Sequence, residues 1–193
     1  MTAALTYACA ACAGLLVSAE YMRTGWLRIA SKLAASIAFV LLGFEAFHVG
    51  HDVVRVAFAQ WIFLGLVLGA VGDTALLGAS NKAFLVGLVA FLGGHIAYVL
   101  AAAQLIGPAD WLGFAGVWAP LPVVAGAIAL AMLWPKLGAM RVPVIAYVLT
   151  IVAMVVAAIA VARSEALPEV QRYRFVVGAA LFFVSDLAVA RDR

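Results

Sequence analysis

The chain has 193 residues, of which 68% are hydrophobic and 11% are charged, and its mean hydropathy is +1.17. Soluble domains are close to half apolar and a quarter charged, so this composition excludes a soluble fold. The net charge of +3 does not indicate nucleic-acid binding, because the twelve Lys and Arg residues are spread between apolar runs and form no basic face. The composition is that of an integral membrane protein.

Apolar runs separated by short charged or Gly/Pro-marked breaks predict an all-α, polytopic transmembrane bundle of about seven helices. No linker or soluble domain interrupts the runs, so we expect a single transmembrane helical domain over residues 1–193. The predicted helices cover residues 4–19, 30–47, 56–77, 83–103, 112–134, 142–162 and 174–190.

Two patterns near the start of the chain resemble half of a metal site. Cys9 and Cys12 lie in the first segment, but no second Cys pair exists, which favours small side chains in a membrane helix. His48, His51 and Asp52 follow the second helix without further ligands, which favours a solvated loop. We therefore expect neither a metal nor a cofactor.

The middle helices carry residues that shape packing. Pro120 and Pro122 predict a kink or an irregular start in the fifth helix. Small residues at helical packing intervals let backbones approach closely and predict a compact bundle. These residues are Gly65, Gly69, Gly72, Gly87 and Gly94.

The loops differ in basic charge. Eight Lys and Arg residues belong to one set of alternate loops and ends, and four belong to the other. The positive-inside rule then predicts an external N-terminus, with the loops after the first, third and fifth helices on the cytoplasmic side. The expected location is the inner, or cytoplasmic, membrane.

Four polar residues from four helices are predicted to lie at a similar depth near the cytoplasmic side. Asp186 precedes the basic end of the last helix by five residues, and Tyr147 follows the basic start of its helix by six, so both lie roughly 8–9 Å inside. Asp73 lies about 27 Å from the outer side, and Lys32 opens the second helix at the inner side. An ionisable residue within lipid is a functional hypothesis by default.

Each of these residues also has a structural interpretation. Either aspartate alone is compatible with an interfacial residue reaching water, and Lys32 with a cation that extends to the membrane surface. His95 and Tyr98 share a face of the fourth helix, about 20–24 Å from its cytoplasmic start. They either line a deeper part of one cavity or form hydrogen bonds within the bundle.

Five motifs resemble signatures of the YhhN family of membrane proteins, the lysoplasmalogenase-like family. Ser31-Lys32 and Gly72-Asp73 come first. The pattern F-x-x-G-L-x-x-F-L-x-G-H-x-x-Y follows over residues 84–98, then P-V-x-x-Y-x-x-x-x-x-x-M over 143–154 and G-A-x-L-F-x-x-S-D over 178–186. The chain departs from the family at Leu33, where Pro is usual, and family members commonly have eight helices.

The resemblance implies hydrolysis of the vinyl ether bond of a lysoplasmalogen, which releases a fatty aldehyde and a glycerophospho-alcohol. The catalytic pair would be Asp73 and Asp186. The implied partners are a lysophospholipid substrate and membrane lipids, with no nucleic acid. The residues expected to bind the substrate are Lys32, His95, Tyr98, Tyr147 and Ser185.

The chemistry of a vinyl ether suits two carboxyl groups. Protonation of the outer alkene carbon gives an oxocarbenium-like cation, so the reaction needs a carboxylic acid and a carboxylate that stabilises the cation and activates water. A medium of low dielectric constant favours the neutral form of one of them. Which aspartate is the acid stays open, although Asp186 is favoured as the more enclosed. Lys32 would suit a lipid phosphate, and Tyr147 could orient a carboxyl group or the ether oxygen.

Two other classes of membrane protein use intramembrane acids. A proton-coupled transporter of a small solute or lipid would use the aspartates as proton relays, but no inverted repeat is evident. A retinal-binding sensor would need a lysine in the last helix, and residues 174–190 contain none.

Overall fold

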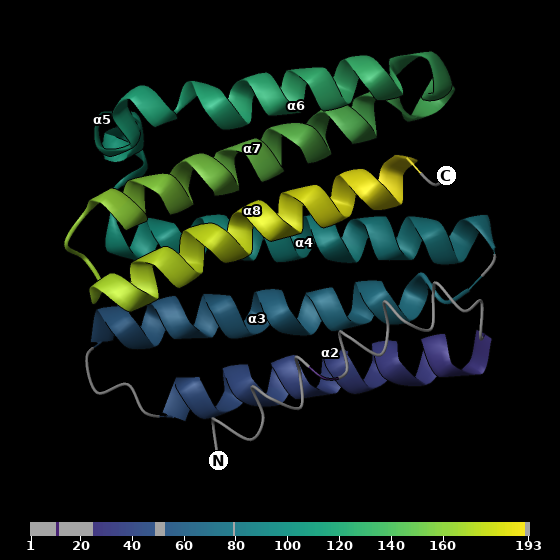
Figure 1. Cartoon of the computed structure of the whole chain (residues 1–193), viewed down its shortest axis with the longest axis horizontal. Coiled ribbons are helices and arrows are strands. Elements are labelled where there is room, and N and C mark those ends of the chain that lie inside the picture. The colour runs from purple at the N-terminus through teal and green to yellow at the C-terminus, as the bar shows by residue number, and fades with distance from the viewer. Residues whose placement is uncertain (1–10, 12–24, 49–52, 79, 192–193) are drawn as a thin grey trace. The chain divides into compact units, whose positions relative to one another are not determined.

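The computed structural model describes residues 11, 25–48, 53–78 and 80–191 (Figure 1). The predicted first helix over residues 4–19, with Cys9 and Cys12, lies outside the described residues except for position 11. His51 and Asp52 also lie outside them.

The described residues form helices and no strands, which confirms the predicted fold class. Long helices begin and end within a few residues of the predicted bounds, and four short 3-10 turns join the later ones. The α-helices are α2 (Gly25–His48), α3 (Val53–Ala75), α4 (Asn81–Leu105), α5 (Trp111–Ala115), α6 (Pro120–Leu133), α7 (Arg141–Arg163) and α8 (Glu169–Arg191).

Several of these helices are long and apolar enough to cross a bilayer. Within the described residues, α3, α4, α7 and α8 each meet that requirement, and a fifth span is counted if α5 and α6 form one broken crossing. The apolar part of α2, Ile29–Phe44, is shorter. At a rise of about 1.5 Å per residue, a helix needs about 20 residues to cross the hydrocarbon core. The protein is therefore a multi-pass membrane protein.

The chain forms two compact units that divide between Ala97 and Tyr98, within α4. In the first unit, α2 and α3 pack side by side in opposite directions (Figure 1). A methyl group added at Gly94 of α4 would lie 3.2 Å from the carbonyl oxygen of Gly65 on α3, so the absence of a side chain permits this close approach. The prediction of one domain over residues 1–193 stays a prediction.

In the second unit, α7 packs against α5, α6 and α8. Eight of its residues are buried, and Met154 is among the largest fully buried side chains of the described chain. A methyl group added at Gly126 of α6 would meet Val152 of α7 at 2.5 Å, so α6 also approaches its neighbour at a glycine. The core of this unit thus follows α7.

The segment between α4 and α6 is bent. Residues 108–118 and 120–136 meet at an angle of 87°. The 3-10 turn Gly116–Trp118 makes the break, with Gly116 at a φ of 54°, a conformation that glycine adopts without strain. Pro120 begins α6 at a position where its missing N–H costs nothing. The predicted irregular start of this span is confirmed.

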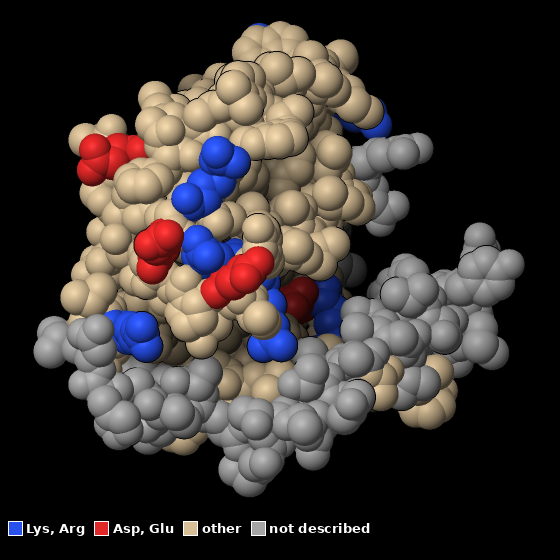
Figure 2. Space-filling view, turned by 60° about the vertical axis from the view of Figure 1, so that its left-hand side comes forward, with Lys and Arg blue, Asp and Glu red and all other residues tan. Residues whose placement is uncertain are grey.

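Charge is sparse on the surface of the described residues. The face in Figure 2 shows acidic and basic side chains as a few small groups on an otherwise uncharged surface. Arg163 lies in the last turn of α7 and Glu169 in the first turn of α8, where each complements the local helix dipole. These two charges thus lie at helix ends, outside the long apolar stretches of α7 and α8.

Candidate functional site

The first polar cluster lies between α2 and α3, in the first unit. The Lys32 Nζ atom lies 3.1 Å from Asp73 Oδ1, and the Ser36 hydroxyl donates a hydrogen bond of 3.2 Å to Asp73 Oδ2. Both oxygens of this carboxyl group therefore accept from α2. Lys32 and Ser36 can share one acceptor because residues four apart lie on one helix face.

The surroundings of this cluster are apolar but not sealed. The side chains of Lys32 and Asp73 are 22% and 26% exposed, whereas Ser36 is 3% exposed. The nearby Ser31 hydroxyl donates to the carbonyl oxygen of Leu27 within α2. The ion pair is thus partly accessible from outside the protein, whereas the Ser36 hydroxyl that donates to Asp73 is buried.

Ser36 is the residue of this cluster that the sequence interpretation missed. It lies four residues after Lys32, on the same helix face, and that spacing was the available signal. A single serine in an apolar helix commonly bonds to its own backbone, as Ser31 does, so the residue type alone does not identify a serine that contacts another helix.

The second polar cluster lies between α7 and α8, in the second unit. The Tyr147 hydroxyl donates a hydrogen bond of 2.6 Å to Asp186 Oδ2. This length lies within the usual range for an O–H···O hydrogen bond. Both side chains are half-buried, and each comes from a helix that is long and apolar enough to span a bilayer. A neighbouring helix therefore fixes one oxygen of Asp186.

His95 and Tyr98 are both buried on α4. His95 is fully buried in the first unit. Tyr98 belongs to the second unit, and its ring meets that of Phe182 on α8 edge-on, with 6.0 Å between the ring centres. That geometry is one that aromatic pairs prefer. The Tyr98 ring therefore packs against the helix that carries Asp186.

Ser185 is exposed on α8. Successive residues of an α-helix point about 100° apart, so Ser185 and Asp186 do not share a face. The structure therefore brings Lys32 to Asp73 and Tyr147 to Asp186, and it leaves Ser185 on a different side of its helix.

The chemistry available to these clusters is that of carboxyl groups. Among the described residues, no three His, Cys, Asp or Glu side chains come together as metal ligands. Each aspartate is held by a donor from the neighbouring helix, and each can accept or donate a proton within largely apolar surroundings. Fold and clusters together define a helical membrane protein in which two carboxyl groups, on helices long and apolar enough to span a bilayer, each contact a neighbouring helix.

The comparison with protein families then identifies the chain more closely. It belongs to the YhhN family, whose model matches residues 27–193. The resemblance that the five motifs indicated is thereby confirmed. Neither the curated proteins nor the solved structures contain a match to the chain.

Proposed function

We propose that this protein hydrolyses the vinyl ether bond of a lysoplasmalogen in the cytoplasmic membrane, and that Asp73 and Asp186 are its catalytic residues. The YhhN family includes lysoplasmalogenases. The observation that carries the proposal is the presence of two aspartates within apolar helices, each held by a donor from a neighbouring helix. Ionisable residues are costly within a membrane, so their presence there is a functional-site hypothesis by default.

The partners of the two aspartates favour different roles. An ion pair forms between charged groups, so the contact with Lys32 favours Asp73 as the carboxylate that stabilises the cation and accepts a proton from water. Asp186 is then the proton donor, and the Tyr147 hydroxyl orients its carboxyl group through Oδ2. This division matches the use of two carboxyl groups in glycoside hydrolysis.

The proposed reaction has three steps. Asp186 gives its proton to the outer alkene carbon, and the C–O bond gains double-bond character in the resulting oxocarbenium ion. A water molecule adds to the inner carbon and loses a proton to Asp73, which gives a hemiacetal. The hemiacetal then collapses to a fatty aldehyde and the free glycerol hydroxyl, and one water is consumed overall. The proton accepted by Asp73 returns to Asp186 through solvent.

The remaining predicted residues are proposed to hold the lipid. The Lys32 ammonium group, which contacts Asp73, can also contact a lipid phosphate. His95 and Tyr98 offer a buried polar surface on α4, and Ser185 offers a hydroxyl on the exposed side of α8. The proposed chemistry needs no cofactor.

The test is release of aldehyde from a purified lysoplasmalogen by the purified protein in detergent. Asp73→Asn and Asp186→Asn should each lower kcat/KM by about 10²- to 10⁴-fold, the usual contribution of an acid or base. Asp110→Asn is the matched control, because Asp110 is exposed before α5 and should leave the rate unchanged. In D2O the aldehyde should carry one deuterium on the carbon next to the carbonyl, since that carbon receives the proton.

Two results would reject the proposal. The first is full activity in both aspartate variants, which would make the carboxyl groups incidental. The second is no aldehyde from any lysoplasmalogen in detergent, together with proton-coupled uptake of a solute by the same protein in vesicles. That second result would identify the transporter that the intramembrane acids also allow.

A further inference from the structure

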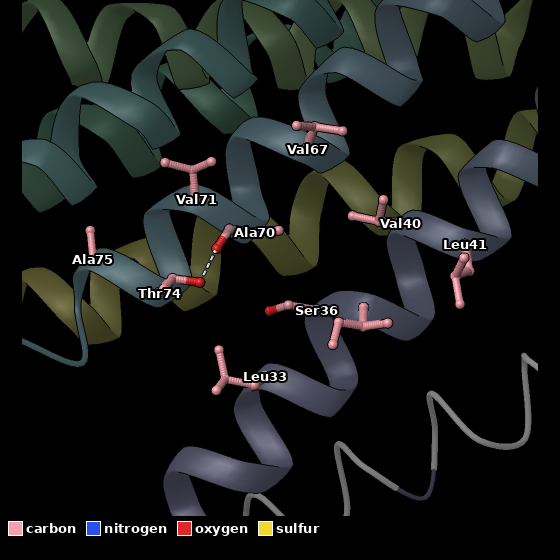
Figure 3. Close-up of a pocket in the computed structure, with 10 residues that line it drawn as sticks. Leu33, Ser36, Val40, Leu41, Val67, Ala70, Val71, Thr74 and Ala75 are labelled. Carbon is pink, nitrogen blue, oxygen red and sulfur yellow. Dashed lines mark hydrogen bonds between the residues drawn. The ribbon is translucent and has the colours of Figure 1, made fainter.

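An apolar groove runs between α2 and α3, entirely within the first unit (Figure 3). Its volume is about 610 Å³. Along α2 its lining extends from Leu33 to Leu41, and along α3 from Val67 to Ala75. Each of these stretches covers eight residue steps, or about 12 Å at the rise of an α-helix. This length approaches half of the roughly 30 Å hydrocarbon core, which is the depth of one leaflet.

The groove offers almost no free polar groups to an occupant. Two hydroxyls line it, those of Ser36 and Thr74. The Ser36 hydroxyl donates to Asp73, and the Thr74 hydroxyl donates to the carbonyl oxygen of Ala70, as the dashed line in Figure 3 shows. Both hydroxyl hydrogens are therefore used within the protein, and a hydrocarbon is the occupant that such a wall favours.

One end of the groove is charged. Lys32, Ser36 and Val40 lie four residues apart and so form one stripe on α2. Ser36 and Val40 line the groove, and the Lys32–Asp73 ion pair stands at the end of that stripe. The opposite end, at Leu41 and Val67, is apolar. A molecule with one polar end and one long apolar end matches this gradient.

The groove is also open along its side. Ile37 is 61% exposed, and Leu41 and Val71 are each 46% exposed. In a membrane these side chains face lipid, so an occupant can enter laterally without crossing water.

We infer that this groove binds the hydrocarbon chain of a single-chain lipid, with the polar head of the lipid at the Lys32–Asp73 pair. The groove and its polar end stand on the geometry alone, whereas the choice of a single-chain ether lipid rests on the proposed function. The groove then sets which chain lengths the protein accepts, because it ends about 12 Å from its polar end.

The test uses a lysolipid with a saturated alkyl ether chain that carries a photoreactive diazirine near its middle. This probe lacks the vinyl bond, so its binding is independent of hydrolysis. After illumination of the full-length protein in detergent, mass spectrometry should map the label to groove residues such as Val40 and Val67. Unlabelled lysoplasmalogen should compete with the probe, and a two-chain phospholipid of the same head group should compete at least about tenfold less well.

A groove-filling variant provides the second measurement. Ala70→Phe places a ring in the middle of the groove and should lower labelling about tenfold, since a few excluded methylenes account for that factor. Ala34→Phe is the matched control, because Ala34 is exposed on α2 and does not line the groove. It should leave labelling unchanged, and thermal unfolding in detergent should show both variants folded.

The outcomes separate the groove from the proposed function. Groove labelling without any hydrolysis supports the groove and rejects the hydrolase. Hydrolysis with labelling that maps elsewhere, or that Ala70→Phe leaves intact, overturns the groove and leaves the hydrolase standing. A disulfide between Ala70→Cys and the native Cys9 or Cys12 would show that the N-terminal apolar segment is the occupant, which also overturns the inference. Equal competition by the two-chain lipid would overturn the single-chain assignment.

Discussion

The carboxyl group of Asp186 accepts a short hydrogen bond from the Tyr147 hydroxyl. Tyr147→Phe removes that hydroxyl and keeps the ring, so α7 and α8 should still pack. A hydrogen bond within a protein contributes about 0.5–1.5 kcal/mol net, so kcat/KM for aldehyde release should fall roughly 2- to 10-fold. Tyr173→Phe, at an exposed position on the same unit, is the matched control and should have no effect. Equal rates for both variants would contradict an orienting role for Tyr147.

The ion pair between Lys32 and Asp73 should contribute to stability as a coupled unit. Lys32→Met and Asp73→Asn each leave a half-buried polar group without its partner, so each should destabilise the protein by about 1–3 kcal/mol. Thermal unfolding in detergent should show that the double variant loses less than the two single losses together, by about 0.5–3 kcal/mol.

The control for this cycle uses two charges that lie apart. Lys136 and Asp110 are both exposed, beyond opposite ends of α6. The changes in the free energy of unfolding that Lys136→Met and Asp110→Asn cause should therefore add to within about 0.5 kcal/mol. Additive losses at Lys32 and Asp73 as well would mean that the pair contributes no coupling energy.

At the scale of the helices, the glycines of α3 and α4 should differ in their tolerance of a side chain. A methyl group at Gly94 would lie 3.2 Å from the backbone oxygen of Gly65, and backbone yields less easily than a side chain. A methyl group at Gly69 meets nothing within 4 Å. Gly94→Ala should therefore destabilise the protein by about 1–2 kcal/mol, whereas Gly69→Ala should stabilise it by about 0.5–1 kcal/mol through helix propensity.

Thermal unfolding in one detergent compares the two glycine variants directly. A stabilising effect of both would show that α3 and α4 do not need their close approach at Gly65 and Gly94.

The helices were predictable from the sequence because apolar runs of spanning length have few alternatives in lipid. The bounds of the helices were less predictable. The helix α2 begins at Gly25 instead of residue 30, and α8 begins at Glu169 instead of residue 174. Polar residues such as Arg172 continue a helix beyond its apolar part, so hydropathy alone does not locate the helix end. The contact between Tyr147 and Asp186 could be anticipated only as a shared depth. Ser36 could not be singled out, because its role depends on how α2 is rotated against α3.

At the scale of the whole molecule, the distribution of Lys and Arg predicts which loops face the cytoplasm. A single cysteine at Ser80, between α3 and α4, should react only with reagents that enter the cell, and one at Glu165, after α7, should react with an impermeant reagent. Both positions are exposed. The measurement uses thiol labelling of intact cells, with Cys9 and Cys12 replaced by Ser. The reverse pattern would invert the orientation and place the Lys32–Asp73 pair on the outer side.

The bend between residues 108–118 and 120–136 has a mechanical consequence for the second unit. Two segments that meet at 87° cannot both follow the bilayer normal, so the shorter one must lie along the membrane surface if α6 crosses. Its exposed Leu112 and Trp118 suit that interfacial layer. If α6 tilted, one end of the segment 108–118 would enter the hydrocarbon core and the other end would enter water. A segment that lies along the membrane surface therefore opposes tilting of α6. Because α6 packs on α7, and α7 on α8, it opposes tilting of those two helices as well.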